Sequence, residues 1–244
     1  MALQTNRFTR LVVAGISLLS ILISTGTVFG HHLWIIQNGD GYMVARGALP
    51  DRLDSYDPTA VKMIKAVDRE GGEIPITRIA EKEKALFRAE RPPCLAAVRC
   101  EWGGRVETTR GKKLMTRQEA EKQGFKVLKA FTSTQTSKTM FAETTAISNP
   151  LGLVFEVVPL KSPYRIGPDE PLEVKLLFDG APLKHAVVSL NDQTRTETDA
   201  QGIARFAVKQ SGRQLIAAKH IVPVKDNSEI DYLKFMTFFI FEAK

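Results

Sequence analysis

Four histidines are the residues of this chain best suited to chemistry: the adjacent pair His31 and His32, and the isolated His185 and His220. Imidazole nitrogens suit copper, nickel, cobalt and zinc better than magnesium or calcium. If processing frees the α-amine of His31, that amine and the ring nitrogen of the same residue can close a chelate on one metal ion. His32 and His220 are the candidates for further ligands, so we predict a transition-metal site made by His31, His32 and His220.

Each histidine also has a plain structural interpretation. His31 is a solvated terminal residue if cleavage falls at another bond, and His32 is then a polar surface residue. His220 ends a predicted strand and is a surface or hydrogen-bonded histidine if it binds no metal. His185 lies beside a turn, and we expect it to be exposed.

The N-terminal segment bears directly on His31. Residues 1–10 carry Arg7 and Arg10 and no acid, residues 11–24 are apolar or small, and Val28 and Gly30 are small residues at positions −3 and −1. This order is typical of a cleavable signal peptide, and the apolar run is shorter than the roughly 20 residues of a spanning helix. We predict cleavage of residues 1–30 and a periplasmic chain that begins at His31, with an uncleaved membrane anchor as the alternative.

The two cysteines, Cys94 and Cys100, are separated by five residues in the segment PPCLAAVRCEW. In an exported protein, two thiols this close usually pair. The sequence therefore predicts a disulfide between them. A thiolate pair that binds a soft metal is the alternative, although two thiolates alone do not fill a tetrahedral site.

Composition narrows the range of functions. Without the two arginines of the predicted signal, the remaining 32 basic and 27 acidic residues give a net charge of +5. This modest excess comes without an arginine-rich stripe, so we expect no nucleic-acid partner. The motifs of hydrolases, nucleotide-binding proteins and zinc peptidases are missing, and we expect a protein that is not an enzyme.

Short strands must position these residues. The C-terminal part alternates apolar and polar residues between turn signals, as in an immunoglobulin-like or transthyretin-like β-sandwich. The N-terminal part is also β-rich, and residues 116–123 predict one short helix, with Thr116 as its cap and Glu119 in the capping-box position. We predict an all-β chain with an N-terminal domain at 31–149 and a C-terminal β-sandwich at 150–244. The predicted strands are residues 33–37, 42–46, 61–68, 74–79, 86–90, 125–131, 139–144, 153–159, 172–178, 186–190, 194–198, 203–208, 215–220 and 233–241.

Several segments together resemble a known family. They are HHLW at residues 31–34, the long stretch LGLVFEVVPLKSPYRIGPDEPLEVKLLFDGAPLKHAVVSL, then TDAQGIARF and GRQLIAAKH. In this order they resemble the DUF4198 family, exported β-rich proteins described as periplasmic components of nickel or cobalt uptake systems. The resemblance implies nickel or cobalt bound by His31 and His220, and an integral-membrane metal transporter as partner. The chain departs from the family in having His32 at a position that is more often acidic, and in its cysteine pair.

Three functions follow from these patterns. The first is capture of Ni²⁺ or Co²⁺, with Cu²⁺ or Zn²⁺ also compatible with the nitrogen ligands, and presentation of the ion to a transporter. The second is a β-sandwich that binds a protein or carbohydrate, in which the histidines are incidental. The third is a copper oxidase with an N-terminal histidine chelate, which needs a second histidine within reach.

Overall fold

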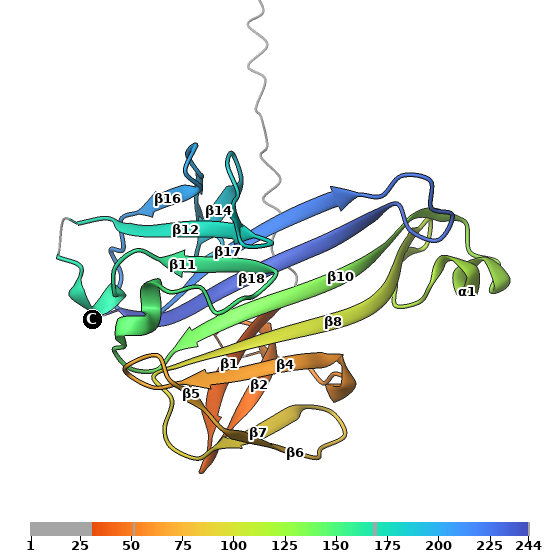
Figure 1. Cartoon of the computed structure of the whole chain (residues 1–244). Coiled ribbons are helices and arrows are strands. Elements are labelled where there is room, and N and C mark those ends of the chain that lie inside the picture. The colour runs from red at the N-terminus through yellow and green to blue at the C-terminus, as the bar shows by residue number, and fades with distance from the viewer. Residues whose placement is uncertain (1–30, 51, 168–169, 244) are drawn as a thin grey trace, which may run out of the picture.

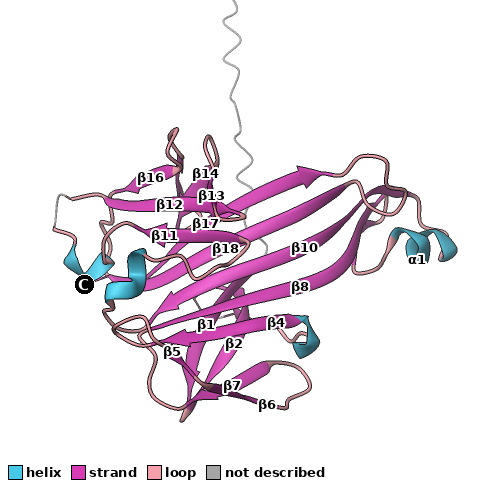
Figure 2. Ribbon diagram, viewed as in Figure 1, coloured by secondary structure: helices cyan, strands magenta, loops and turns pink. Residues whose placement is uncertain are grey.

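The computed structural model describes residues 31–50, 52–167 and 170–243, and strands dominate them, as the sequence predicted (Figures 1 and 2). Within these residues, no helix has the length and apolarity needed to cross a membrane. The predicted signal peptide, residues 1–30, lies outside the described residues. The strands are β1 (His32–Asn38), β2 (Gly41–Ala48), β3 (Arg52–Leu53), β4 (Val61–Val67), β5 (Glu73–Ile74), β6 (Ile76–Ile79), β7 (Ala85–Ala89), β8 (Leu95–Thr108), β9 (Gly111–Lys113), β10 (Val127–Met140), β11 (Phe155–Pro159), β12 (Leu172–Phe178), β13 (Ala181–Pro182), β14 (Val187–Leu190), β15 (Thr194–Glu197), β16 (Ile203–Phe206), β17 (Gly212–Pro223) and β18 (Tyr232–Ala243).

The strands form three sheets. A large central sheet has the order β15-β14-β17-β18-β10-β8-β4-β5, with β9 paired to β8. A second sheet, β1-β2-β7-β6 with β3, packs on one face of it, and a third, β11-β12-β13 with β16, packs on the other (Figure 1). Alternate residues of β18 therefore enter different cores: Met236 and Phe238 face the second sheet, whereas Phe239 and Phe241 face the third.

Both predicted domains contribute to the central sheet. The last strand, β18, lies between β17 and β10, and it runs parallel to β10, which precedes the predicted boundary at residue 149. Each of the two cores also contains residues from both sides of that boundary: Leu215 packs with Trp34 in one core, and Leu95 packs with Phe239 in the other. The two halves of the sequence thus share one continuous framework.

The predicted helix is confirmed as α1 (Arg117–Lys122). The Thr116 side chain accepts a hydrogen bond from the Glu119 backbone N–H, and the Glu119 side chain accepts one from Thr116, so the capping box is complete. Ala120 anchors the helix by packing against Val106 and Ala130. Three short 3-10 helices, Pro58–Ala60, Thr145–Ser148 and Pro163–Arg165, complete the elements.

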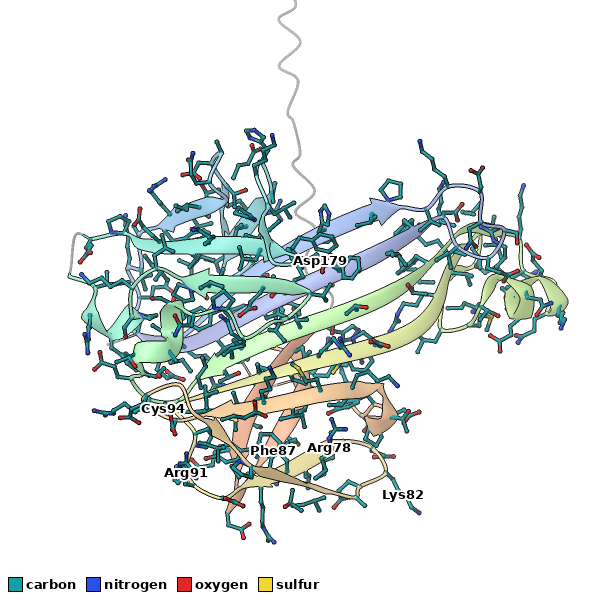
Figure 3. The ribbon with its side chains drawn as sticks, in the orientation of Figure 1. Arg78, Lys82, Phe87, Arg91, Cys94 and Asp179 are labelled. Atoms are coloured by element: carbon teal, nitrogen blue, oxygen red, sulfur yellow. The ribbon has the colours of Figure 1, made fainter. Side chains whose placement is uncertain are left out.

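The predicted disulfide between Cys94 and Cys100 is wrong, because both cysteines are free thiols. The sequence predicted no strand in their segment, but β8 runs through it from Leu95. Six positions along an extended strand span about 20 Å, whereas the Cα atoms of a disulfide lie roughly 4.4–6.8 Å apart. Cys94 lies at the start of the strand (Figure 3), and Cys100 is fully buried in the core under the second sheet.

A buried ion pair joins the central and third sheets. The Lys138 Nζ lies 3.0 Å from the Glu156 Oε1, and both side chains are 1% exposed. The same carboxylate accepts hydrogen bonds from the backbone N–H groups of Leu151, at 2.7 Å, and Leu153, at 3.1 Å. Burial lowers the pKa of Lys138, and the charge of Glu156 counteracts that shift. Each oxygen of the carboxylate thus accepts at least one hydrogen bond, as a buried charge requires.

Candidate functional site

His31 lies beside Asp54, a residue that the sequence analysis did not single out. The His31 Nδ1 is 2.5 Å from the Asp54 Oδ2. Strand pairing produces this contact, since β1 pairs with β2 and β3 folds back on the other side of β2, so that Gly47 opposes both His32 and Leu53. Asp54 follows β3 directly, and its N–H donates to the Arg46 carbonyl at 2.7 Å.

Gly47 allows β3 to approach this closely. A Cβ atom at this position would lie 1.8 Å from the carbonyl oxygen of Arg52, and the glycine has a φ of +157°. Backbone cannot yield to such a contact as a flexible side chain can. The glycine therefore fixes how near Asp54 comes to His31.

Two guanidinium groups share the Asp54 carboxylate with His31. The Arg52 Nε lies 3.4 Å from the Asp54 Oδ1, and the Arg46 Nη1 lies 4.0 Å from the Oδ2. Desolvation and the nearby charge of Arg46 lower the pKa of His31, against the opposing effect of Asp54. The shift favours the neutral ring, in which the Nδ1 donates its proton to Asp54, so a metal ion at the Nδ1 would have to displace that proton.

Gln135 holds the His31 backbone on the central sheet. Its Nε2 donates to the His31 carbonyl at 3.3 Å, and its Oε1 accepts from the Trp102 Nε1 at 2.9 Å. The Arg46 guanidinium lies over the Trp102 ring, 4.7 Å from its centre. The position of His31 thus depends on β2, β8 and β10 together.

His32 points away from His31 and is 4% exposed. Its Nε2 lies 2.8 Å from the Asp192 Oδ2, and its Nδ1 accepts from the Leu49 N–H at 3.3 Å. Both ring nitrogens are therefore in use, and the ring packs edge-on against Phe238. Neighbouring residues of an extended chain face opposite sides, which separates the two rings.

His220 lies on the other face of the central sheet. It pairs with Phe235 and packs on Phe178, with ring centres 4.6 Å apart, in the region of the third sheet. Burial lowers its pKa. His220 lines a cavity of about 470 Å³ together with His185. The structure thus brings His220 together with His185 and keeps it apart from His31 and His32. Across the described part of the chain, no three side chains from His, Cys, Asp and Glu form a group that could hold a metal.

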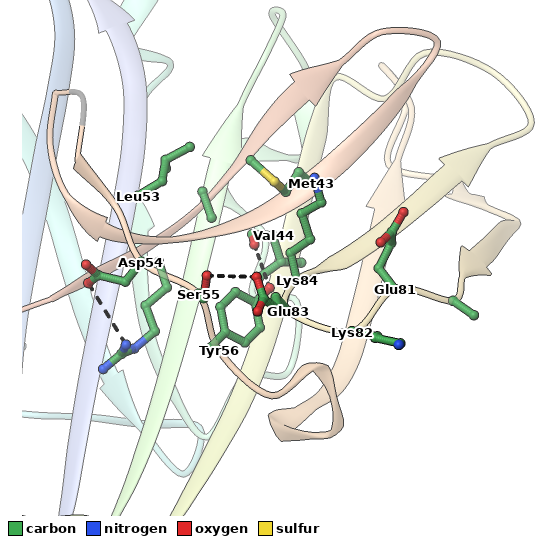
Figure 4. A pocket seen from close by; sticks show the side chains of 13 residues that line it. Met43, Val44, Leu53, Asp54, Ser55, Tyr56, Glu81, Lys82, Glu83 and Lys84 are labelled. Carbon is green, nitrogen blue, oxygen red and sulfur yellow. Dashed lines mark hydrogen bonds and ion pairs between the residues drawn. The ribbon is translucent and has the colours of Figure 1, made fainter.

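In the described part of the chain, Arg46 lines three cavities, two of which include Asp54 or His31. The larger of these two, about 680 Å³, lies between β2 and residues 80–84 and includes Asp54 (Figure 4). Its polar groups largely satisfy one another: the Tyr56 hydroxyl donates to the Val44 carbonyl at 2.6 Å, and the Ser55 hydroxyl donates to Glu83 at 3.3 Å. The smaller cavity, about 380 Å³, includes His31 and a set of basic side chains from the central sheet.

Comparison with known proteins identifies the family. No curated protein matches the chain significantly. Among solved structures, the D0-D1 domain of intimin is similar over 83% of this chain and 89% of its own, with 11% identity and a TM-score of 0.22, and nothing about function follows from it. The model of a domain of unknown function, DUF4198, matches residues 28–222, which is most of the chain and includes all four histidines. The resemblance seen in the sequence is confirmed at the level of the family, and the chain belongs to the DUF4198 family.

Proposed function

We propose that the protein is an exported, non-catalytic metal-binding protein that captures Ni²⁺ or Co²⁺ in the periplasm for a membrane transporter. The observation that supports this function is the His31–Asp54 pair, with 2.5 Å between the Nδ1 and the Oδ2. The Nδ1 is the ring nitrogen that can close a chelate with the α-amine of the same residue. Cleavage after Gly30 would supply that amine, giving two nitrogens and one carboxylate oxygen on one ion.

The geometry changes the ligand set that the sequence predicted. His32 is committed to Asp192 and Leu49, and His220 lies behind the central sheet, so we assign neither to the site. Asp54 takes their place. A copper oxidase of the histidine-chelate type needs a second histidine beside the first, and none of the described histidines lies there, which favours capture over catalysis.

Arg46 and Arg52 weaken the attraction of the site for a dication, because both carry positive charge close to Asp54. This effect suits an ion that must be released again. Substituting Arg52 by Gln should therefore tighten metal binding by a factor of about 2 to 5, as expected for one exposed charge. This variant retains both proposed ligands, His31 and Asp54.

The proposal is tested by calorimetric titration of the chain that begins at His31 with Ni²⁺, Co²⁺, Cu²⁺ and Zn²⁺. We expect Asp54→Asn to weaken binding about 10-fold or more, since it removes a charged ligand and keeps the side-chain shape. One glycine added before His31 removes the chelating amine and should have an equal or larger effect. His220→Asn serves as the matched control and should bind as the unmodified chain does.

Two results would contradict the proposal. One is a dissociation constant weaker than about 100 μM for all four metals, which corresponds to less than about 5.5 kcal/mol of binding. The other is unchanged affinity in the chain with the added glycine, which would mean that the amine is not a ligand.

A further inference from the structure

The long strands of the central sheet extend beyond the second sheet, as β8, β10 and β18 do toward α1 in Figure 1. The cavity of about 380 Å³ lies on this extension, next to His31. Five basic side chains line it and no acidic side chain does. They are Arg46, Arg105, Lys112, Lys113 and Lys234.

A β-bulge places Arg105 on the cavity face. In the pairing of β8 with β10, Glu101 opposes Thr134 and Gly104 opposes Thr132, so two residues of β8, Trp102 and Gly103, oppose the single Ser133. Gly103 takes the left-handed conformation that such a bulge favours, with a φ of +67°. If the same sequence paired regularly from Glu101 onward, Gly104 would oppose Phe131 and point into the cavity, and Arg105 would point to the other face.

Cross-strand neighbours complete the wall. Arg105 opposes Phe131 on β10, and Ser133 on β10 opposes Lys234 on β18. Ser133 is 4% exposed, and the described residues offer its hydroxyl no hydrogen-bond partner. Its hydroxyl can therefore donate to a ligand.

The positive charge of the cavity is only partly balanced. Lys112 pairs with Glu107 at 3.3 Å, and Arg46 is 4.0 Å from Asp54. Among the described residues, no carboxylate lies within ion-pair distance of Arg105 or Lys234, and Glu107 acts on Lys234 from farther away. The Arg46 Nε is buried without a hydrogen-bond acceptor in the same part of the chain. A buried donor of this kind is costly unless a ligand or water satisfies it.

The pKa values of the two unpaired cations reflect the same crowding. Burial, followed by the charge of Arg46, lowers the pKa of Arg105 to about 10. Burial and then the charge of Lys112 lower the pKa of Lys234. Arg105 remains charged at neutral pH, and bound anionic oxygens would relieve the repulsion between these groups.

We propose that this cavity binds a small ligand carrying two or more anionic oxygen groups, with Arg105 and Lys234 as the main contacts and the Ser133 hydroxyl as an additional donor. A guanidinium fork matches a carboxylate or a phosphate in two parallel hydrogen bonds, and an ammonium adds a point charge. Carboxylates and phosphates share this chemistry, and the experiment distinguishes them. The inference does not require metal binding at His31.

The test is titration of the metal-stripped chain with citrate and with pyrophosphate, in buffers freed of metal by a chelating resin. We expect one or both to bind with a dissociation constant below about 1 mM, the affinity worth roughly 4 kcal/mol. Binding of citrate but not pyrophosphate would identify a carboxylate ligand, and binding of pyrophosphate but not citrate would identify a phosphate ligand. The trimethyl ester of citrate, which carries no charge, should not bind.

Variants assign the contacts. Arg105→Gln and Lys234→Gln should each weaken binding about 10-fold or more, because each removes a charged hydrogen-bond donor. Lys175→Gln is the matched control, since Lys175 is a half-exposed lysine of β12 in the third sheet, and it should change affinity less than about 2-fold. If Arg105→Gln unfolds the chain, as circular dichroism would show, Lys234→Gln decides alone. The proposal is refuted if neither anion binds below about 1 mM, or if the two cavity variants lose no more affinity than the control.

Discussion

Removing the charge of Glu156 should destabilise this fold more than removing any exposed carboxylate. Glu156→Gln keeps the shape of the side chain but leaves Lys138 beside a neutral amide, with Lys138 still 1% exposed. The amide group also turns a donor toward a site where the carboxylate accepts from the Lys138 ammonium or from the N–H of Leu151 or Leu153.

The size of the effect follows from what the lysine can do. It can stay charged without a partner, which for a broken buried pair costs about 3–5 kcal/mol. It can instead lose its proton, and at about 1.4 kcal/mol for each pH unit below the ordinary lysine pKa this costs about 5 kcal/mol at pH 7. The cost of deprotonating Lys138 is the upper limit of the destabilisation, so we expect a loss of about 3–5 kcal/mol in the free energy of unfolding.

Urea unfolding at pH 7, followed by tryptophan fluorescence and circular dichroism, measures this loss. The control is Glu173→Gln, which breaks the exposed pair between Glu173 and Arg205, 2.7 Å apart on neighbouring strands, and should cost less than about 1 kcal/mol. Adding Lys138→Met to Glu156→Gln should recover part of the loss, because it removes the stranded charge. A loss below about 1 kcal/mol for Glu156→Gln, or no recovery in the double variant, would refute the reasoning.

Three further predictions concern single residues. Gly47→Ala should destabilise the fold by about 2 kcal/mol or more in the same urea assay, because its Cβ would lie 1.8 Å from a carbonyl oxygen of β3. Gly39 also has a positive φ, but a Cβ added there would have nothing within 4 Å, so the control Gly39→Ala should cost less. Burial lowers the pKa of His220, so the unfolded chain binds its proton first on acidification. When the pH falls from 7.5 to 5.5, the free energy of unfolding should decrease less in the His220→Phe variant than in the unmodified protein. Equal decreases in the two proteins would contradict this. Burial raises the pKa of Cys100 to about 12. A thiol reagent should therefore label Cys94 alone in the native chain and both cysteines after denaturation. An intact mass two hydrogens below that of the dithiol would instead show that the two cysteines form a disulfide.

Local signals made most of the fold predictable. Alternation of apolar and polar residues located β12, β16 and the flanking turns, and the Thr116–Glu119 box located α1. Strand β8 was missed because its sequence, LAAVRCEWGGRVET, begins with small residues, lacks clean alternation and contains a bulge. The error about the disulfide follows from the same omission, since a loop can bring two cysteines together and an extended strand cannot.

The candidate site was predictable only in part. The position of His31 directly after the predicted signal peptide drew attention to it from the sequence. Asp54 and Arg105 come near it through strand pairings and a bulge, and these depend on long-range register that no local pattern reveals. His220 was grouped with His31 because its imidazole ends a predicted strand and because the family resemblance implied it as a ligand. The parity of β17, in which Ala217 faces one core and His220 the other side of the sheet, separates them.

The central place of β18 has a consequence for how the chain reaches this structure. This strand is the last element of the fold, yet it lies between β17 and β10 and lends residues to both cores. A ribosome or a translocation channel that releases the chain from its N-terminus delivers Tyr232–Ala243 after every other element. Until then β10 has an open edge and both cores lack the side chains of β18, so cooperative folding waits for this strand. A truncation that removes β18 should therefore yield an unfolded chain, and not a shortened native protein.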